Sequence, residues 1–196
     1  MSDPLFEEDK DATALTEDER QQLSPSYITL RSELDEAEQR NILEAETWAF
    51  SRKRKVLSED FLKLLHKRMF GNVWRWAGEF RQTEHNIGVD AYRISMDLRQ
   101  LLEECQYWVE HKTYEPDNIA ARFSHRLVQI HPFPNGNGRH SRIAADLLLV
   151  SLGQERFSWG QQANLVDANE TRRSYIDALY AADRHDYRQL FKFVRS

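Results

Sequence analysis

Apolar residues recur at helical spacing along most of this 196-residue chain, and that period restricts the fold to an assembly of helices. Ser58 is a candidate helix cap, Pro116 and Pro132 mark the start and end of one helix, and Gly153 marks the end of another. The apolar stripes are those of helices that pack into a common core. We therefore predict an all-α fold. The predicted helices cover residues 33–51, 58–70, 98–109, 116–130, 137–152, 170–182 and 187–194.

One segment, residues 80–94, departs from the helical pattern, and we refer to it as the flap. Asn86 and Gly88 are turn-prone, whereas Val89 and Tyr92 tolerate extended geometry. The pattern predicts a short β-hairpin, and an irregular loop is equally compatible with it.

Charge divides the chain into two parts. Residues 1–46 hold fourteen Asp and Glu against four Lys and Arg, a net charge of −10, so the full-chain net charge of −5 leaves +5 for residues 47–196. We predict an acidic N-terminal arm or helix packed on the core at 1–46, followed by one domain at 47–196; a solvated or disordered arm is the plain alternative. The basic part suits an anionic nucleotide, but its cations are not grouped with aromatic residues as in nucleic-acid grooves.

Cysteine content and apolar runs bear on the cellular setting. Cys105 is the only cysteine, so the chain has no internal disulfide, and its place on an apolar helical face predicts a core thiol. The first residues lack the basic start and apolar stretch of a signal peptide, and no apolar run is long enough to span a membrane. We expect a cytoplasmic protein without membrane or nucleic-acid partners.

The twelve residues 131–142, HPFPNGNGRHSR, combine a possible base with an anion-binding pattern. Gly136 and Gly138 flank Asn137 where a loop enters a helix, and there main-chain N–H groups and the helix dipole attract phosphate. Arg139 and Arg142 share one helical face, and an imidazole such as that of His131 exchanges protons near neutral pH. An ordinary turn with a helix-end histidine and solvated arginines is the alternative for each feature alone.

This run resembles the Fic (Fic/Doc, Fido) family signature, His-x-Phe-x-(Asp or Glu)-Gly-Asn-Gly-Arg-x-x-Arg, at every defined position except the acidic one, which is Asn135. Residues 65–81, LHKRMFGNVWRWAGEFR, resemble the family's helix end and its Trp-Ala-Gly-x-x-Arg stretch. Residues 86–89 are similar to its flap, and the likeness covers about residues 55–190. The acidic leading segment resembles the subgroup called mobile mystery protein B, a name that states no function.

The resemblance implies a Fic-type helical bundle whose β-hairpin flap lies over the active site. It also implies a protein adenylyltransferase that transfers AMP from ATP to a Ser, Thr or Tyr hydroxyl of a target protein, with Mg²⁺ or Mn²⁺. His131 would deprotonate that hydroxyl. Tyr175 and Tyr180 lie on the helix near the nucleotide in similar proteins, although buried core tyrosines are commoner than base-stacking ones. The remaining roles implied are phosphate binding by Gly136, Asn137, Gly138, Arg139 and Arg142, and target docking by Asn86, Ile87, Gly88 and Val89.

Asn135 departs from the signature at the residue that helps to hold the metal. An amide oxygen is a weaker ligand for Mg²⁺ than a carboxylate, so we expect slower transfer, an altered nucleotide or metal preference, or binding without catalysis. Two alternatives follow: a Doc-like phosphotransferase, which the intact Gly-Asn-Gly-Arg and Arg142 disfavour, and a silent nucleotide-binding or toxin-regulating module.

Regulation is the last expectation from the resemblance. Many family members carry an inhibitory helix, (Ser or Thr)-x-x-x-Glu-(Gly or Asn), whose Glu pairs with the second arginine of the signature. Thr29 with Glu33 and Ser32 with Glu36 have the first spacing but lack the final residue, so we interpret both glutamates as exposed helix residues. An inhibitory, antitoxin-like protein acting in trans is a further hypothesis.

Overall fold

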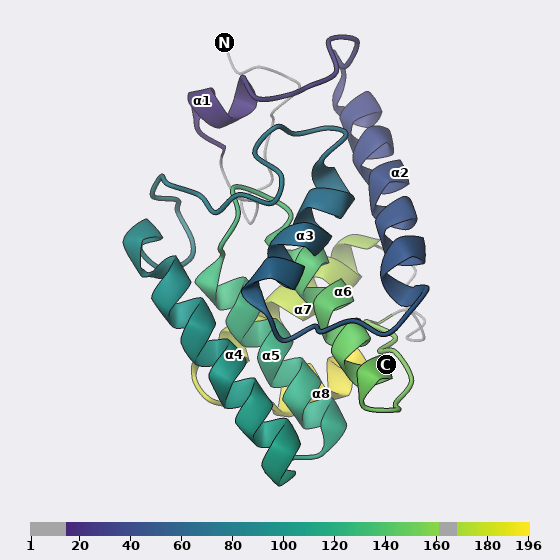
Figure 1. The fold of residues 1–196 in the computed structure, drawn as a ribbon, viewed down its shortest axis with the longest axis vertical. Coiled ribbons are helices and arrows are strands. Elements are labelled where there is room, and N and C mark those ends of the chain that lie inside the picture. Colours follow the sequence, from purple (N-terminus) through teal and green to yellow (C-terminus); the bar gives the residue numbers. More distant parts are fainter. Residues whose placement is uncertain (1–14, 161–167) are drawn as a thin grey trace.

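The regular elements in the described part of the chain are all helices, as predicted (Figure 1). The structure is a computed structural model that describes residues 15–160 and 168–196. Residues 1–14 of the predicted acidic arm lie outside the described residues. The helices are α1 (Glu17–Arg20), α2 (Arg31–Phe50), α3 (Glu59–Phe70), the 3₁₀ helix η2 (Ala91–Arg93), α4 (Ile94–His111), α5 (Pro116–Ile130), α6 (Asn137–Ser151), α7 (Ala168–Asp183) and α8 (Arg188–Val194).

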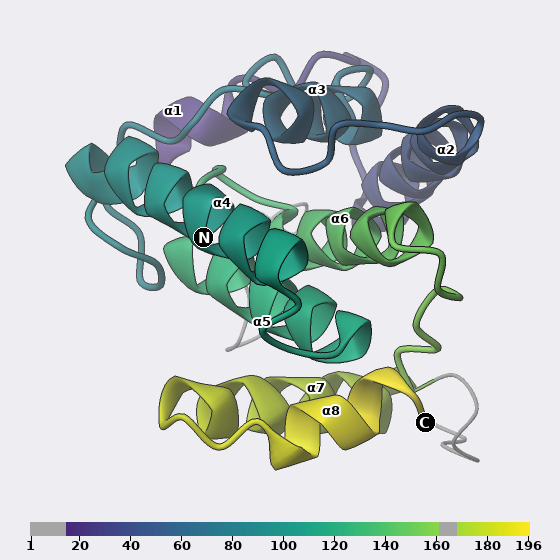
Figure 2. The same ribbon diagram turned by 60° about the horizontal axis from the view of Figure 1, so that its bottom comes forward.

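Three layers of helices stack on one another, with α4, α5 and α6 in the middle (Figure 2). Helices α2 and α3 pack together on one side of this layer, and α7 and α8 pack together on the other. Helix α5 contacts α4, α6 and α8, so it is held by three neighbouring helices. Cys105 is fully buried in the core, as predicted, and burial raises the pKa of its thiol.

Helix ends follow the capping residues in the sequence. The Ser58 hydroxyl accepts a hydrogen bond from the Phe61 N–H (3.3 Å) and caps α3. Pro116 occupies the first turn of α5, and Gly153 follows α6 in the left-handed conformation, with φ of 78°. The short helix α1 was not predicted, although Thr16 and Glu19 form a capping box at its start.

The flap does not contain the predicted β-hairpin; it is an irregular loop that ends in η2. Its main chain bonds to a distant part of the protein at two points. The Arg81 N–H donates to the Pro132 carbonyl (2.9 Å), and the Val89 N–H donates to the Ile130 carbonyl (3.3 Å). Because these partners lie at the end of α5 and just beyond it, the flap is fastened beside that end without strand pairing.

Helix α2 joins the N-terminal part of the described chain to α3. The Asn41 side chain donates to the Arg68 carbonyl and accepts from the Asn72 N–H, both at 3.0 Å, so it ties α2 to the end of α3. Over residues 15–160 and 168–196, no helix is long and apolar enough to cross a membrane.

Candidate active site

The candidate base, His131, stands where α5 ends. Its backbone is left-handed, with φ of 55°, and its side chain is buried. Burial lowers the pKa of His131 to about 4, against the opposing effect of a hydrogen bond to the main chain of Val128. The imidazole is therefore neutral at pH 7. Because one ring nitrogen donates to the Val128 carbonyl, the other is free of a proton and can accept one.

Arg81 and Gly88 hold His131 in place from the flap. The buried Arg81 side chain donates from Nε to the His131 carbonyl (2.7 Å) and from its other nitrogens to the carbonyls of Thr83 and Val89. Gly88 has φ of 104°, and a Cβ added to it would lie 2.6 Å from the His131 Cβ. Only glycine lets the flap approach His131 so closely.

The loop between His131 and α6 is closed by the side chain of Asn137. Its Oδ1 accepts from the Phe133 N–H (3.0 Å), and its Nδ2 donates to the Phe133 carbonyl (2.7 Å). The Asn137 side chain is buried, with both amide atoms used inside the loop. Its contribution to a phosphate site is therefore its main-chain N–H.

The start of α6 has the properties of an anion site. Gly136 precedes it with φ of 77° and provides no side-chain cap, so the N–H groups of residues 137–139 point out of the helix without such a partner. A Cβ added to Gly138 would meet no atom within 4 Å, so the space beside it is open. Free N–H groups and the positive end of the helix dipole favour a phosphate here.

Arg139 is engaged by a glutamate that the sequence did not reveal as a site residue. Its Nη1 lies 2.6 Å from Oε2 of Glu38 on α2, and the Trp74 indole donates to the other Glu38 oxygen (2.7 Å). Glu38 is buried, and the Arg139 guanidinium lies 4.9 Å from the centre of the Phe70 ring. The cation that was predicted to bind phosphate is thus paired within the protein.

Arg142 lies about one turn further along α6. Its Nε donates to the Gly138 carbonyl (3.3 Å), and its guanidinium stands 5.5 Å from the centre of the Tyr175 ring. Among the described residues it forms no salt bridge. Tyr175 is buried against Trp159, whereas Tyr180 is 54% exposed, so the two predicted adenine contacts differ in their surroundings.

The two glutamates considered for regulation have local roles, as interpreted from the sequence. The Glu33 carboxylate accepts from the N–H groups of Thr29 (2.9 Å) and Leu30 (3.0 Å) at the start of α2. Glu36 forms an exposed pair with Arg40 one turn along the helix.

A buried histidine, His66, supports the loop at Asn135. The Gly78 N–H donates to His66 Nδ1 (3.0 Å), so Nε2 carries the proton and donates to the Asn135 carbonyl (3.0 Å). The His66 ring stacks on Phe133 with centroids 3.7 Å apart, and burial lowers its pKa well below the usual range. The neutral imidazole thus joins the Trp-Ala-Gly stretch to the residue that replaces the acidic signature position.

We predict that His66→Phe lowers the rate of nucleotide transfer roughly fivefold, because the loop loses its hydrogen bond at Asn135, worth about 1 kcal/mol, while the ring stack is retained. The measurement is kcat together with KM for ATP. His66→Gln restores a donor toward Asn135 and should recover part of the loss. Equal rates for the phenylalanine variant and the parent protein, at equal thermal stability, would contradict the role.

These observations define a class of site: a neutral buried histidine beside an uncapped helix start that carries two arginines. Residues 56–149 match the model of the Fic/DOC family. The chain is 30% identical over 146 residues to a protein adenylyltransferase Fic of Drosophila grimshawi, and 32% identical over 143 residues to that of Drosophila melanogaster. These alignments cover 72% and 71% of this chain but only 28% and 27% of the two relatives.

Solved structures agree on the fold. The N-terminal Fic domain of a Bartonella quintana effector has a TM-score of 0.69 at 16% identity, covering 90% of this chain and 91% of that one. The BepC protein of Bartonella tribocorum, solved with bound AMPPNP, has a TM-score of 0.67 at 17% identity, covering 92% and 97%. Through residues 56–149 the chain belongs to the Fic/DOC family.

Proposed function

We propose that the protein transfers AMP from ATP to a Ser, Thr or Tyr hydroxyl of a target protein. The observation that carries the proposal is the neutral His131 beside the uncapped start of α6. The adenylyltransferase names of the insect relatives and the AMPPNP bound by the Bartonella tribocorum neighbour support this chemistry.

In the proposed reaction, the unprotonated nitrogen of His131 takes the proton of the target hydroxyl. The hydroxyl oxygen then forms a bond to the α-phosphorus while the bond to pyrophosphate breaks. The N–H groups at the start of α6, together with Arg142, stabilise the negative charge that develops on the phosphates. Alignment by the loop supplies much of the acceleration.

The metal proposed to act with ATP is Mg²⁺ or Mn²⁺, which when bound neutralises phosphate charge. Asn135 is the residue at the signature's metal position, and its Oδ1 already accepts a hydrogen bond from the Gly136 N–H (2.5 Å). An amide oxygen engaged in this way is a poor ligand for a hard cation, and Mg²⁺ commonly keeps waters and leans on substrate phosphates.

Glu38 restrains Arg139 in this proposal, because ATP phosphates must compete with the buried carboxylate for the guanidinium. We predict that Glu38→Gln tightens ATP binding about tenfold, or about 1.4 kcal/mol. That is a fraction of the Coulomb energy of about 4 kcal/mol for two charges 4 Å apart at an effective dielectric constant of 20. Isothermal titration calorimetry of ATP binding to the variant and to the parent protein measures this difference in affinity.

The matched control is Glu36→Gln, an exposed position on the same helix that should leave the affinity unchanged. Weaker binding in Glu38→Gln would instead mean that Glu38 positions Arg139 for the phosphates.

We also propose an inhibitory, antitoxin-like protein that acts in trans. Its addition should suppress AMP transfer by the parent protein and by Glu38→Gln.

Labelled ATP tests the proposed activity directly. Incubation with Mg²⁺ or Mn²⁺ and α-labelled ATP should label a target or the protein itself, whereas γ-labelled ATP should not. Label from the γ-position alone would support the Doc-like phosphotransferase, and label from neither position would support the silent binding module favoured by Asn135.

A further inference from the structure

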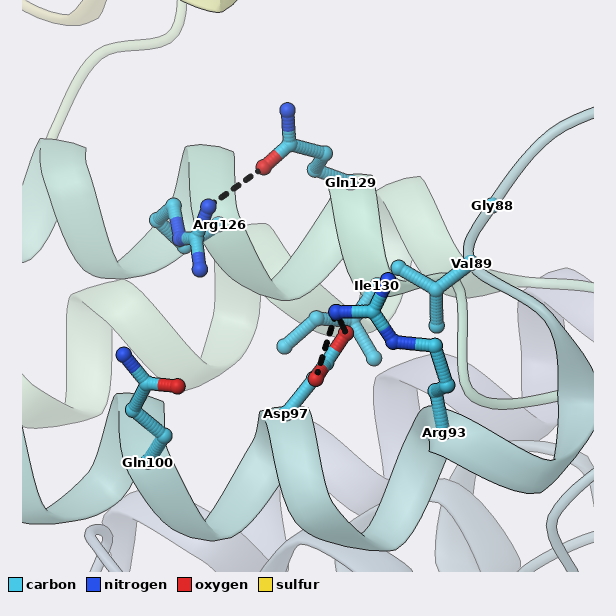
Figure 3. A pocket seen from close by; sticks show the side chains of 8 residues that line it. All are labelled: Gly88, Val89, Arg93, Asp97, Gln100, Arg126, Gln129 and Ile130. Atoms are coloured by element: carbon cyan, nitrogen blue, oxygen red, sulfur yellow. Dashed lines mark hydrogen bonds and ion pairs between the residues drawn. The ribbon is translucent and has the colours of Figure 1, made fainter.

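A polar pocket lies beside the flap, on the side that faces α4 and α5 (Figure 3). Its volume of about 420 Å³ falls within the range of about 300–1,000 Å³ that is usual for sites of small ligands. Gly88 and Val89 form its flap wall, and Ile130, the residue before His131, lies in its α5 wall. The pocket is therefore next to the candidate base, outside the phosphate site at the start of α6.

The pocket lining has an excess of positive charge. Arg93 and Asp97, at the start of α4, face each other, with the Arg93 Nη2 lying 3.2 Å from both carboxylate oxygens. Arg126 on α5 is the second cation, so two arginines and one aspartate leave a net charge of +1. Asp97 is nearly buried and already paired, so Arg126 faces no free carboxylate in the lining.

Arg126 is held in position by a neutral partner. Its Nη1 donates to Oε1 of Gln129 (2.9 Å), and the Gln129 amide in turn donates to Asp183 (3.0 Å). Arg126 itself forms no salt bridge within residues 15–160 and 168–196. The remaining nitrogens of its guanidinium fork match the geometry of a carboxylate.

We infer that this pocket binds an acidic side chain of the target protein that lies close in sequence to the modified hydroxyl. The inference rests on the proposed function and adds a substrate class to it. A target segment whose hydroxyl reaches His131 passes the flap, and in an extended segment each residue advances about 3.3 Å. Arg126 precedes His131, the residue after α5, by five positions, which is about 7.5 Å along the helix axis at about 1.5 Å per residue, so an Asp or Glu two or three positions from the hydroxyl spans that separation.

The test uses short peptides with a central Ser, Thr or Tyr in which each flanking position is set in turn to Asp, Glu, Lys or Ala. With α-labelled ATP, the parent protein should label peptides with an acidic residue at one or two positions about tenfold more than their lysine counterparts. Arg126→Gln should lose this preference, and Arg126→Glu should reverse it. Arg99→Glu, the same charge change at an exposed site on α4 outside the lining, should keep it.

Binding of the same peptides without nucleotide, measured by fluorescence anisotropy, separates this inference from the proposed function. If no label is transferred but acidic peptides bind the parent protein more tightly than Arg126→Glu, the pocket is supported and the transferase is not. The inference is overturned if Arg126→Glu keeps the acidic preference in either assay, or if the parent protein never prefers Asp or Glu over Lys. Binding with no dependence on peptide charge would also overturn it.

Discussion

Replacing His131 with alanine is expected to lower AMP transfer by about 10²- to 10⁴-fold, the range usual for loss of a positioned general base. The phosphate site is built from α6 and its arginines, so ATP affinity should change little. Single-turnover labelling with α-labelled ATP measures the first quantity, and calorimetry measures the second. A variant that transfers AMP at the parent rate would remove His131 from the mechanism.

The pH dependence of transfer gives a second test of this base. His131 acts in its neutral form, and burial lowers its pKa to about 4, so the neutral form predominates throughout the range from pH 8 down to pH 5. Titration of His131 should therefore not reduce the rate in that range. An ordinary imidazole, with a pKa of about 6.5, would halve it near pH 6.5. A halving at that pH would mean that the histidine is more exposed in the working enzyme.

The helices were predictable because their causes are local. An apolar residue every three or four positions, the Ser58 cap and Pro116 in the first turn of α5 are all visible in a short window of sequence. The uncapped start of α6 was predictable for the same reason, since the two glycines and the following helix are adjacent in the chain.

The course of the flap and the role of Glu38 were not predictable, because their partners are distant in sequence. Val89 bonds to Ile130, and Glu38 reaches Arg139 across 101 positions. A local pattern with turn-prone Asn86 and Gly88 predicts a hairpin only when its main-chain groups have no better partners elsewhere. Glu38 sits among other glutamates of α2, and nothing in its neighbourhood distinguishes it.

His66 lies between these cases. It falls within the stretch that resembles the family's helix end, but its role depends on two main-chain groups that meet only in the fold: the Gly78 N–H and the Asn135 carbonyl. A histidine alone in an apolar helix is compatible with many core arrangements. These two hydrogen bonds fix the tautomer of His66 and its role as a support for the loop at Asn135.

Restoring the acidic residue of the signature, Asn135→Asp, is expected to lower the Mg²⁺ concentration for half-maximal transfer by about 10- to 100-fold. Each factor of ten corresponds to about 1.4 kcal/mol, and a carboxylate adds a full charge where the amide has only a dipole. The loop should keep its shape, because an aspartate oxygen can still accept from the Gly136 N–H and the main-chain carbonyl still accepts from His66. The measurement is the rate of AMP transfer as a function of Mg²⁺ concentration.

Asn118→Asp is the matched control, because it makes the same charge change at the start of α5, the end opposite to His131. It should leave the Mg²⁺ dependence unaltered. An unchanged half-maximal concentration in Asn135→Asp would show that position 135 does not reach the metal and that the nucleotide phosphates hold it alone. A lower half-maximal Mg²⁺ concentration together with a faster rate in Asn135→Asp would instead mean that the parent protein is an attenuated transferase. The neutral residue at the metal position would then account for its slower chemistry.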